Sequence, residues 1–481
     1  SYEATGGAIY NDEYRTIGDI SGDFIGNYAY SSYAYGGAIY NNQYGTINSI
    51  DGDFIGNYAI SSSYGANGGA IYNNQYGTIR DITGDFIGNY VSSVSSHYDA
   101  KGGAICNDEY GTISNIDGNF NGNYVSTSSY YAAKGGAIYN DGIIENITGD
   151  FIGNHASSSS SDAKGGAIYN DEVIENITGN FVDNHISSSY SYAYGGAIYN
   201  SYSGGGTKYK EINIAGNFIG NYASSYSSYA SSSYVYGGAI YNENSIITIS
   251  GASTFTDNYV EFNDNKKSNA IFNKASYSDT TINFNSGNIV INDAIIGENS
   301  DSNTSIKSIF NFAGQTTATS DNDVITLNNS ITNNDITQGN IDVNLSKGTL
   351  KLGHYYSALL NDTFYGTFGN GVNLTISGDS TLTLIDDDTH SVSLGNLTLN
   401  SDVNLGMDVD LFDNSSDTFT TDALTSNDYN IILKQANVIK DTDKHITEVT
   451  VNNHGGVLKI DDNLIVTNGA NLKNTYLAEV T

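Results

Sequence analysis

Acidic residues recur at one position of a repeated sequence, directly before a phenylalanine. Convergent carboxylates can bind Ca²⁺ or act as acid and base in polysaccharide cleavage. If copies of the repeat stack, neighbouring carboxylates repel by roughly 1 kcal/mol at a water-like dielectric constant, and asparagine at some copies relieves this. The row leaves open a cation-binding stripe, a polysaccharide-cleaving site and a solvated edge. Its members are Asp23, Asp53, Asp85, Asn119, Asp150, Asn180 and Asn217.

Two histidines, His155 and His185, replace the tyrosine that follows Phe-x-x-Asn in other copies. One coil apart, they could bridge a metal ion, but variation within a partly exposed aromatic column explains them as well, and we favour that interpretation. Arginine, a candidate basic partner for a lyase, occurs only at Arg15 and Arg80. The metalloprotease and nucleophile-elbow motifs are absent from the sequence. We predict no catalytic residue, no metal ligand and no cofactor.

A tyrosine column is the candidate binding ladder. Alternation along a strand places it opposite an isoleucine column, so we expect these side chains to face outward. Exposed tyrosines could bind sugars or protein partners, because tyrosine offers contact area at low entropic cost. The alternative is packing of the ladder that only shields the coil surface. The column comprises Tyr10, Tyr40, Tyr72, Tyr139, Tyr169, Tyr199 and Tyr241, with Cys106 and Phe272 at equivalent places.

One repeat positions all these residues. It runs from Gly-Gly-Ala-Ile-Tyr-Asn through an Ile-rich piece to Phe-x-x-Asn, then a stretch rich in Ser and Tyr. Most copies begin 30 to 34 residues apart, with one gap of 42, and such a period indicates a solenoid. The tetrads begin at Gly6, Gly36, Gly68, Gly102, Gly135, Gly165, Gly195 and Gly237, with a degenerate copy at Ser268. The Phe-x-x-Asn motifs begin at Phe24, Phe54, Phe86, Phe120, Phe151, Phe181, Phe218 and Phe255.

Each copy offers three short strand candidates, bounded by Gly, Asn and Asp turn signals and too short for helices. We predict an all-β, right-handed parallel β-helix (β-solenoid). It has about 30 residues per coil in the N-terminal half and continues as a less regular β-solenoid in the C-terminal half. Ile and Phe columns face inward, Asn columns form ladders at corners, and Gly-Gly pairs permit tight corners or close coil contact. The Ser/Tyr-rich stretches are expected to be surface loops.

The repeat becomes less regular along the chain, and this change divides the sequence into three segments. Residues 1–265 hold the regular β-helix, 266–428 continue as an irregular β-solenoid with alternating apolar residues, and 429–481 contain longer strands that could cap it.

Composition excludes several functions. The chain has 52 acidic and 18 basic residues and a formal net charge of −34, which argues against nucleic acid and anionic lipid as partners. A single cysteine permits no internal disulfide. No apolar run reaches membrane-spanning length, so we expect no direct membrane insertion of this segment.

The paired motifs resemble the passenger repeats of chlamydial polymorphic outer-membrane proteins and of autotransporter (type V secretion) passengers more broadly. The pairs run from Gly6–Ile9 with Phe24–Asn27 through Gly237–Ile240 with Phe255–Asn258. The resemblance implies a right-handed β-helix exported to a Gram-negative cell surface, usually as an adhesin. The membrane β-barrel of that family is not apparent in this sequence.

We therefore expect a non-enzymatic passenger, extracellular or on the outer-membrane surface of a Gram-negative bacterium, that acts in adhesion or surface structure. Its partner would be a glycan or protein on a host or neighbouring cell, or copies of itself. The alternatives are a self-assembling extracellular fibre or coat subunit and a polysaccharide-active β-helix enzyme.

Overall fold

The computed structural model describes residues 2–94, 98–128, 130–202, 211–226, 235–285, 287–300, 306–313, 324–410, 415–440, 448–451, 458–467 and 477–480. It confirms an all-β chain of parallel stacked coils, a β-solenoid of about 13 turns spaced about 31 residues apart. Contacts divide the chain into two units. Unit 1 comprises residues 1–248 and 254–274, and unit 2 comprises residues 249–253 and 275–481.

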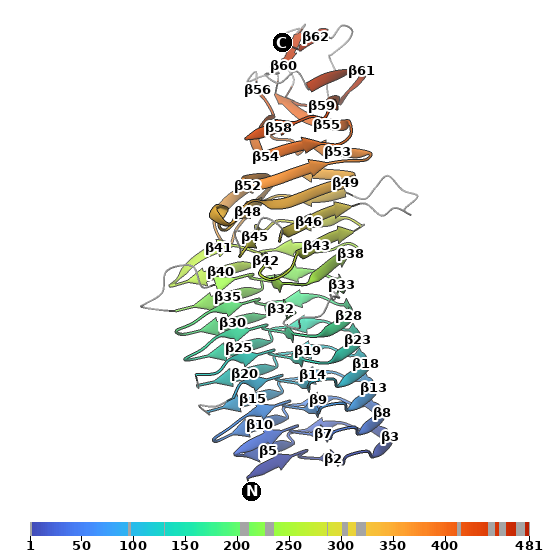
Figure 1. Ribbon diagram of the computed structural model, residues 1–481, viewed down its shortest axis with the longest axis vertical. Coiled ribbons are helices and arrows are strands. Elements are labelled where there is room, and N and C mark those ends of the chain that lie inside the picture. The colour runs from blue at the N-terminus through green and yellow to red at the C-terminus, as the bar shows by residue number, and fades with distance from the viewer. Residues whose placement is uncertain are drawn as a thin grey trace. The chain divides into compact units, whose positions relative to one another are not determined.

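One coil of unit 1 contains five strands rather than the three expected. They are β7 (Ile39–Asn41), β8 (Thr46–Asp51), β9 (Phe54–Ile55), β10 (Tyr58–Ser61) and β11 (Ala66–Asn67). Each pairs in parallel with its copies in the neighbouring coils. In Figure 1 the copies of these strands in successive coils lie one above another along the blue-to-green part of unit 1.

Identical residues face each other from coil to coil. Ile71 is the partner of both Ile39 and Ile105, and all three are fully buried. The phenyl rings from Phe24 to Phe255 stack with centroids 4.7–4.8 Å apart. Burying one Ile or Phe contributes about 1.5–3 kcal/mol, so stacking supplies stability that a single coil lacks. The predicted inward Ile and Phe columns are confirmed.

Both predicted Asn ladders are also confirmed. The Asn41 amide donates to Asn73 Oδ1 at 2.8 Å, and Asn73 donates to Asn107 Oδ1 at the same distance. In the second ladder, Asn57 donates to Asn89 Oδ1 from both its backbone nitrogen and its side chain, each at 2.9 Å. These amides are fully buried, and the bonds along the ladder satisfy groups that would otherwise be costly to bury.

The Gly-Gly pairs act at corners, as expected. Gly36 has φ +62°, which favours glycine. A Cβ on Gly37 would lie 2.0 Å from Gly69 O and 2.6 Å from Tyr58 O. The second glycine therefore lets two backbone segments approach more closely than any side chain would allow.

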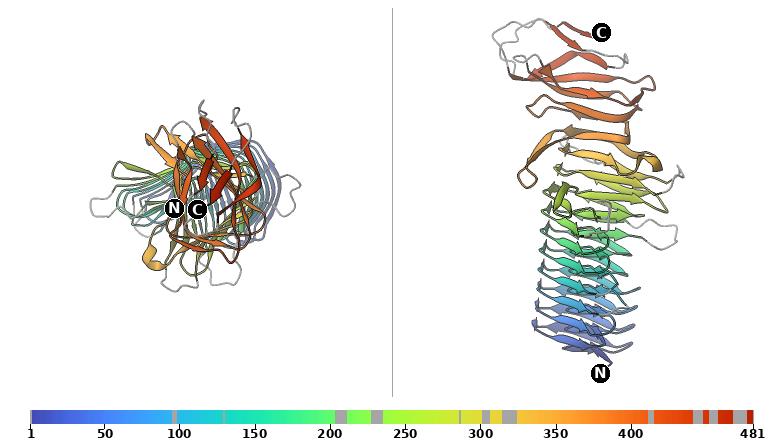
Figure 2. Two further views of the ribbon diagram at one scale, coloured as in Figure 1. Left: turned by 90° about the horizontal axis from the view of Figure 1, so that it is seen from above. Right: turned by 90° about the vertical axis from the view of Figure 1, so that its left-hand side faces the viewer.

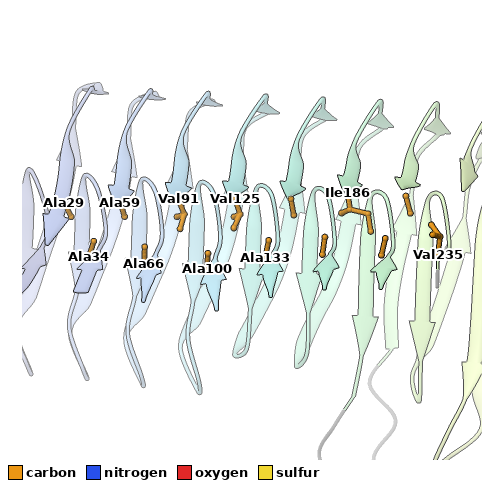
Figure 3. Packing of buried hydrophobic residues seen from close by; sticks show 14 residues of the cluster. Ala29, Ala34, Ala59, Ala66, Val91, Ala100, Val125, Ala133, Ile186 and Val235 are labelled. Atoms are coloured by element: carbon orange, nitrogen blue, oxygen red, sulfur yellow. The ribbon is translucent and has the colours of Figure 1, made fainter. Parts of the chain in front are cut away.

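The expectation that the Ser/Tyr-rich stretches are surface loops holds for only part of the described residues, such as the bend at 159–161, because each stretch also forms strands. In the second coil they form β10 and β11, and in the first β5 (Tyr28–Ser31) and β6 (Tyr33–Tyr35). Small side chains of facing strands meet in a second, narrow core, as Ala29 and Ala34 do in Figure 3. The physical reason is packing, because Ala and Val let the two sheets approach closely. The predicted stretch 223–236 falls partly outside the described residues.

Unit 2 has longer strands. They include β43 (Thr280–Asn285), β46 (Ser308–Ala313), β49 (Ile341–Leu352), β52 (Thr367–Ile376) and β54 (Ser391–Leu399). Each pairs in parallel with the next in this series. A partly buried Asn ladder runs from Asn283 through Asn311 to Asn344 with bonds of 2.9 Å.

Parallel pairing within unit 2 continues from β55 (Val403–Asp410) to β59 (Ile431–Lys440) and β61 (Leu458–Thr467). Figure 2 shows β52, β54 and β55 in orange.

Candidate binding surface

The tyrosine column predicted as an exposed ladder forms a ladder, but it is covered. Tyr10 and Tyr40 stack at 5.3 Å, and Tyr139 and Tyr169 at 5.0 Å. Tyr10 is 48% exposed, whereas the other six are only 2–6% exposed. The expectation of outward exposure is therefore wrong for Tyr40, Tyr72, Tyr139, Tyr169, Tyr199 and Tyr241.

Long side chains from the neighbouring sheet explain this burial. The Tyr35 ring stacks on Tyr72 at 5.1 Å. Lys101 Nζ lies 4.4 Å from the ring centroid of Tyr139, a cation–π contact. Burial raises the pKa of Tyr72 and Tyr139 well above the ordinary value, so these phenols stay protonated.

The covered hydroxyls support the turns that follow them. Tyr40 Oη accepts a hydrogen bond from Asn74 Nδ2 at 2.9 Å, and Tyr72 Oη donates to Asp108 Oδ2 at 2.5 Å. Asn74 in turn accepts from the backbone nitrogen of Gln75 at 2.8 Å. The covered column therefore helps to fix the conformation of a second, more exposed set of residues.

Four tyrosines, which we call the turn tyrosines, project from these turns. Their rings stack with centroids 4.9, 4.9 and 5.0 Å apart and interplanar angles of 5–15°. They are 71%, 42%, 42% and 57% exposed. They are Tyr14, Tyr44, Tyr76 and Tyr110.

All four turn tyrosines have a left-handed backbone, with φ between 57° and 59°. This conformation costs a bulky L-residue roughly 1 kcal/mol or more, whereas Gly or Asn adopts it readily. A turn selected only for its shape would favour Gly or Asn. The four turns carry tyrosine instead, and the stacking of their rings offsets part of this cost.

A polar row accompanies the rings. Gln43 Nε2 donates to Gln75 Oε1 at 3.3 Å, and Gln75 Nε2 donates to Glu109 Oε2 at 2.9 Å. Hydrogen bonding to Glu109 also raises the pKa of Tyr110. The surface thus presents aromatic edges, hydroxyls and amides at the period of one coil.

The surface ends where the turn shortens. Four residues separate β17 (Ile105–Asn107) from β18 (Thr112–Asp117), but only two separate β22 (Ile138–Asn140) from β23 (Ile143–Thr148). The fifth coil therefore has no residue equivalent to Tyr110.

The sequence analysis overlooked the turn tyrosines, although a signal for them exists. The four turns read Asp-Glu-Tyr-Arg, Asn-Gln-Tyr-Gly, Asn-Gln-Tyr-Gly and Asp-Glu-Tyr-Gly. A bulky residue repeated two positions before a strand, in a turn where glycine or asparagine is typical, could have identified them.

The acidic row stabilises the coil edge. Asp23 Oδ1 accepts from the backbone nitrogen of Asp53 at 3.1 Å, and Asp53 Oδ1 accepts from that of Asp85 at 2.9 Å. Asn119 donates to Asp85 Oδ1 from its backbone at 2.8 Å and its side chain at 3.1 Å. Within the described ranges, no group of three or more His, Cys, Asp or Glu side chains is arranged to hold a metal ion.

His155 and His185 stack on each other at 5.0 Å, between Tyr124 and Tyr222 at 5.1 and 4.8 Å. Burial lowers the pKa of His155 to about 4 and also lowers that of His185. Both rings are therefore neutral near pH 7 and occupy the tyrosine positions of the aromatic column.

Comparison of the chain with protein-family models, curated proteins and solved structures gives no match. In the part of the chain that the structure describes, no helix has the length and apolar character needed to cross a membrane.

Proposed function

We propose that this chain is a non-enzymatic β-solenoid that acts in adhesion or surface structure, and that the turn tyrosines form its contact surface. The observation that carries the proposal is the exposed ladder of four tyrosines, each at a left-handed backbone position. Tyrosine gives a rigid contact surface at low entropic cost, which offsets the backbone strain when a partner binds.

The spacing of the ladder favours a repetitive ligand. Three ring-to-ring steps of 4.9–5.0 Å present equivalent groups about 15 Å from end to end. An extended glycan offers sugar hydroxyls for the phenols and amides and apolar ring faces for the aromatic edges. The net charge of −34 disfavours strongly acidic ligands, so the proposal is a neutral or weakly charged glycan.

The cellular setting is part of the same proposal. The resemblance of the Gly-Gly-Ala-Ile and Phe-x-x-Asn repeats to autotransporter passengers supports an extracellular or outer-membrane location in a Gram-negative bacterium. The partner would then be a glycan or a glycosylated protein on a host or neighbouring cell.

Asparagine substitution at the ladder tests the proposal. Asn tolerates the left-handed backbone, so a Tyr44→Asn/Tyr76→Asn variant of the full chain should fold while losing two rings. We expect the wild-type chain to bind in a broad glycan array or a cell-adhesion assay and the variant to bind at least about tenfold more weakly. Tyr190→Asn is the matched control, because Tyr190 is 63% exposed and outside the ladder. Equal binding by variant and wild type, or no binding by wild type across the array and several cell types, would contradict the proposal.

A second candidate function is self-assembly into a fibre or coat. It is favoured by an exposed apolar row on the strands that begin with the buried phenylalanines. Ile25 is 64% exposed, and Ile87, Ile152 and Ile219 are 38–40% exposed. Such a row can pack against the same row of another copy. Sedimentation velocity should then show assembly that weakens in Ile87→Thr/Ile152→Thr, whereas a wild-type chain that stays monomeric at high concentration would exclude this function.

A further inference from the structure

One column of mostly long side chains in unit 1 has a short residue between two long ones. It lies on β6, β11, β16 (Ala100–Lys101), β21 (Ala133–Lys134), β26 (Ala163–Lys164) and β31 (Ala193–Tyr194), which pair in register. Asn67 stands between Tyr35 and Lys101, at a position where the first coil carries Thr5 and the later coils carry Lys or Tyr. The column reads Tyr35, Asn67, Lys101, Lys134, Lys164 and Tyr194.

The short residue leaves a pocket of about 200 Å³. Three tyrosines, Tyr35, Tyr98 and Tyr131, contribute to its wall, and the other lining residues are Gly65, Asn67, Asp99 and Lys101. This volume is below the roughly 300–1,000 Å³ of pockets for drug-sized ligands. It therefore suits a small ligand of about one ring.

Two polar groups of the pocket lack a hydrogen-bond or ion-pair partner among the described residues. Asn67 Oδ1 is buried and accepts no hydrogen bond within the described part of the chain, although a buried acceptor is normally satisfied. Lys101 contacts the Tyr139 ring but forms no ion pair with any described residue, in contrast to Lys134, which lies 2.6 Å from Asp99 Oδ2.

The remaining polar group of the pocket is already engaged. Asp99 binds Lys134 and also accepts from the backbone nitrogen of Ala132 at 2.8 Å. A ligand in the pocket would therefore accept from Lys101 and place an apolar face against tyrosine, and it could donate to the buried Asn67 Oδ1 only if that amide turns toward the pocket. A sugar ring with vicinal hydroxyls meets these conditions.

Local charge selects a neutral ligand. Burial lowers the pKa of Lys101, but Cys106 and the carboxylates of Asp108, Asp99 and Asp141 outweigh this effect and raise that pKa. The field of these carboxylates repels an added anion. We propose that this pocket binds a single neutral sugar ring, such as a terminal hexose or N-acetylhexosamine. The pocket includes none of the turn tyrosines, so this proposal can succeed or fail independently of the proposed function.

Filling the pocket tests the proposal. Asn67→Tyr gives this coil the same residue as Tyr35 and Tyr194 in the column and should be accepted by the fold. Saturation-transfer NMR and calorimetry on the full chain would use free glucose, galactose, mannose, N-acetylglucosamine and N-acetylgalactosamine, with glucuronic acid as an acidic probe. We expect at least one neutral sugar to bind in the millimolar range and Asn67→Tyr to weaken it more than about tenfold.

Lys164→Gln is the matched control, because it removes a charge from the same column two coils away from Lys101. It should leave sugar binding unchanged. Lys101→Gln removes the ammonium donor without filling the pocket and should weaken sugar binding severalfold. This variant still tests the proposal if Asn67→Tyr fails to fold. Three outcomes overturn the proposal: no neutral sugar binds, only the acidic sugar binds, or a neutral sugar binds equally to the wild-type chain, Asn67→Tyr and Lys101→Gln.

Discussion

The buried Asn ladder gives the sharpest stability prediction. Asn89 is fully buried, and its Oδ1 accepts from both the backbone nitrogen and the side chain of Asn57 at 2.9 Å. Its Nδ2 donates to Phe54 O at 2.8 Å and to Asn123 Oδ1 at 3.0 Å. Asn89→Ala removes all four hydrogen bonds and leaves the Asn57 N–H and the Phe54 carbonyl each short of a partner.

The magnitude follows from these two backbone groups. A buried polar group that loses its partner costs about 1–3 kcal/mol, so we expect Asn89→Ala to destabilise the chain by about 2–6 kcal/mol. Because a repeat stack depends on nearest-neighbour contacts, hydrogen exchange should rise first in the coils that contain residues 57 and 89. Urea unfolding followed by circular dichroism would give the total loss.

An exposed ladder offers the matched control. Asn115 Nδ2 donates to Asp81 Oδ1 at 2.7 Å, and Asn115 Oδ1 accepts from Asn146 at 3.0 Å, but this ladder is solvent-exposed. Water replaces the lost bonds, so Asn115→Ala should change stability by less than about 0.5 kcal/mol. Equal losses in Asn89→Ala and Asn115→Ala would refute the argument that burial makes the ladder valuable.

Four further predictions concern backbone geometry and pH. Gly37→Ala should prevent folding of its coil, because the new Cβ would lie 2.0 Å from Gly69 O. Gly56 has open space around it, so Gly56→Ala should cost only about 1 kcal/mol. Soluble yield and thermal melting would distinguish the two variants. Tyr44→Asn should raise the melting temperature slightly, since Asn relieves the strain at φ 58°, and a clear fall in that temperature would contradict the strain argument. His155 has a lowered pKa of about 4, so the unfolded state binds the proton more readily and unit 1 should lose stability as pH falls from about 6.5 to 4, except in His155→Tyr/His185→Tyr. Burial raises the pKa of Asp417 to about 7. The folded state then binds this proton more readily, so unit 2 should lose stability as pH rises from about 4 through 7, and less so in Asp417→Asn. Hydrogen exchange measured at several pH values reports the stability of each unit separately. A wild-type stability that does not change with pH would contradict both pKa shifts.

The repeat predicts the interior of unit 1 because its spacing is nearly constant there. Ile71, Phe86 and Asn73 recur at the same phase of every copy, so stacking alone brings each against its equivalents. The positive φ of Gly36 and the close approach at Gly37 explain why two glycines begin each copy.

The covering of the tyrosine column could not be predicted in the same way. Tyr35 and Lys101 cover Tyr72 and Tyr139, but they belong to stretches whose length varies between copies, which is typical of loops. Alternation gives the direction of the Tyr72 side chain and says nothing about what lies over it. The repeated tyrosine marks the position of the four turns in the sequence, but the left-handed backbone that projects the rings is known only from the folded turn.

Disulfide trapping tests the central claim, the in-register stacking of coils, most directly. Asp81 and Asn115 are direct partners on β13 (Thr78–Thr83) and β18, and Asn146 lies one coil further on. In a chain with Cys106→Ser, the pair Asp81→Cys/Asn115→Cys should form an intramolecular disulfide under mild oxidation, because stacked partners lie about 4.8 Å apart, within the range for a disulfide. Asp81→Cys/Asn146→Cys, two coils apart, should not. Equal cross-linking of both pairs, or none in the first, would contradict the stacked register.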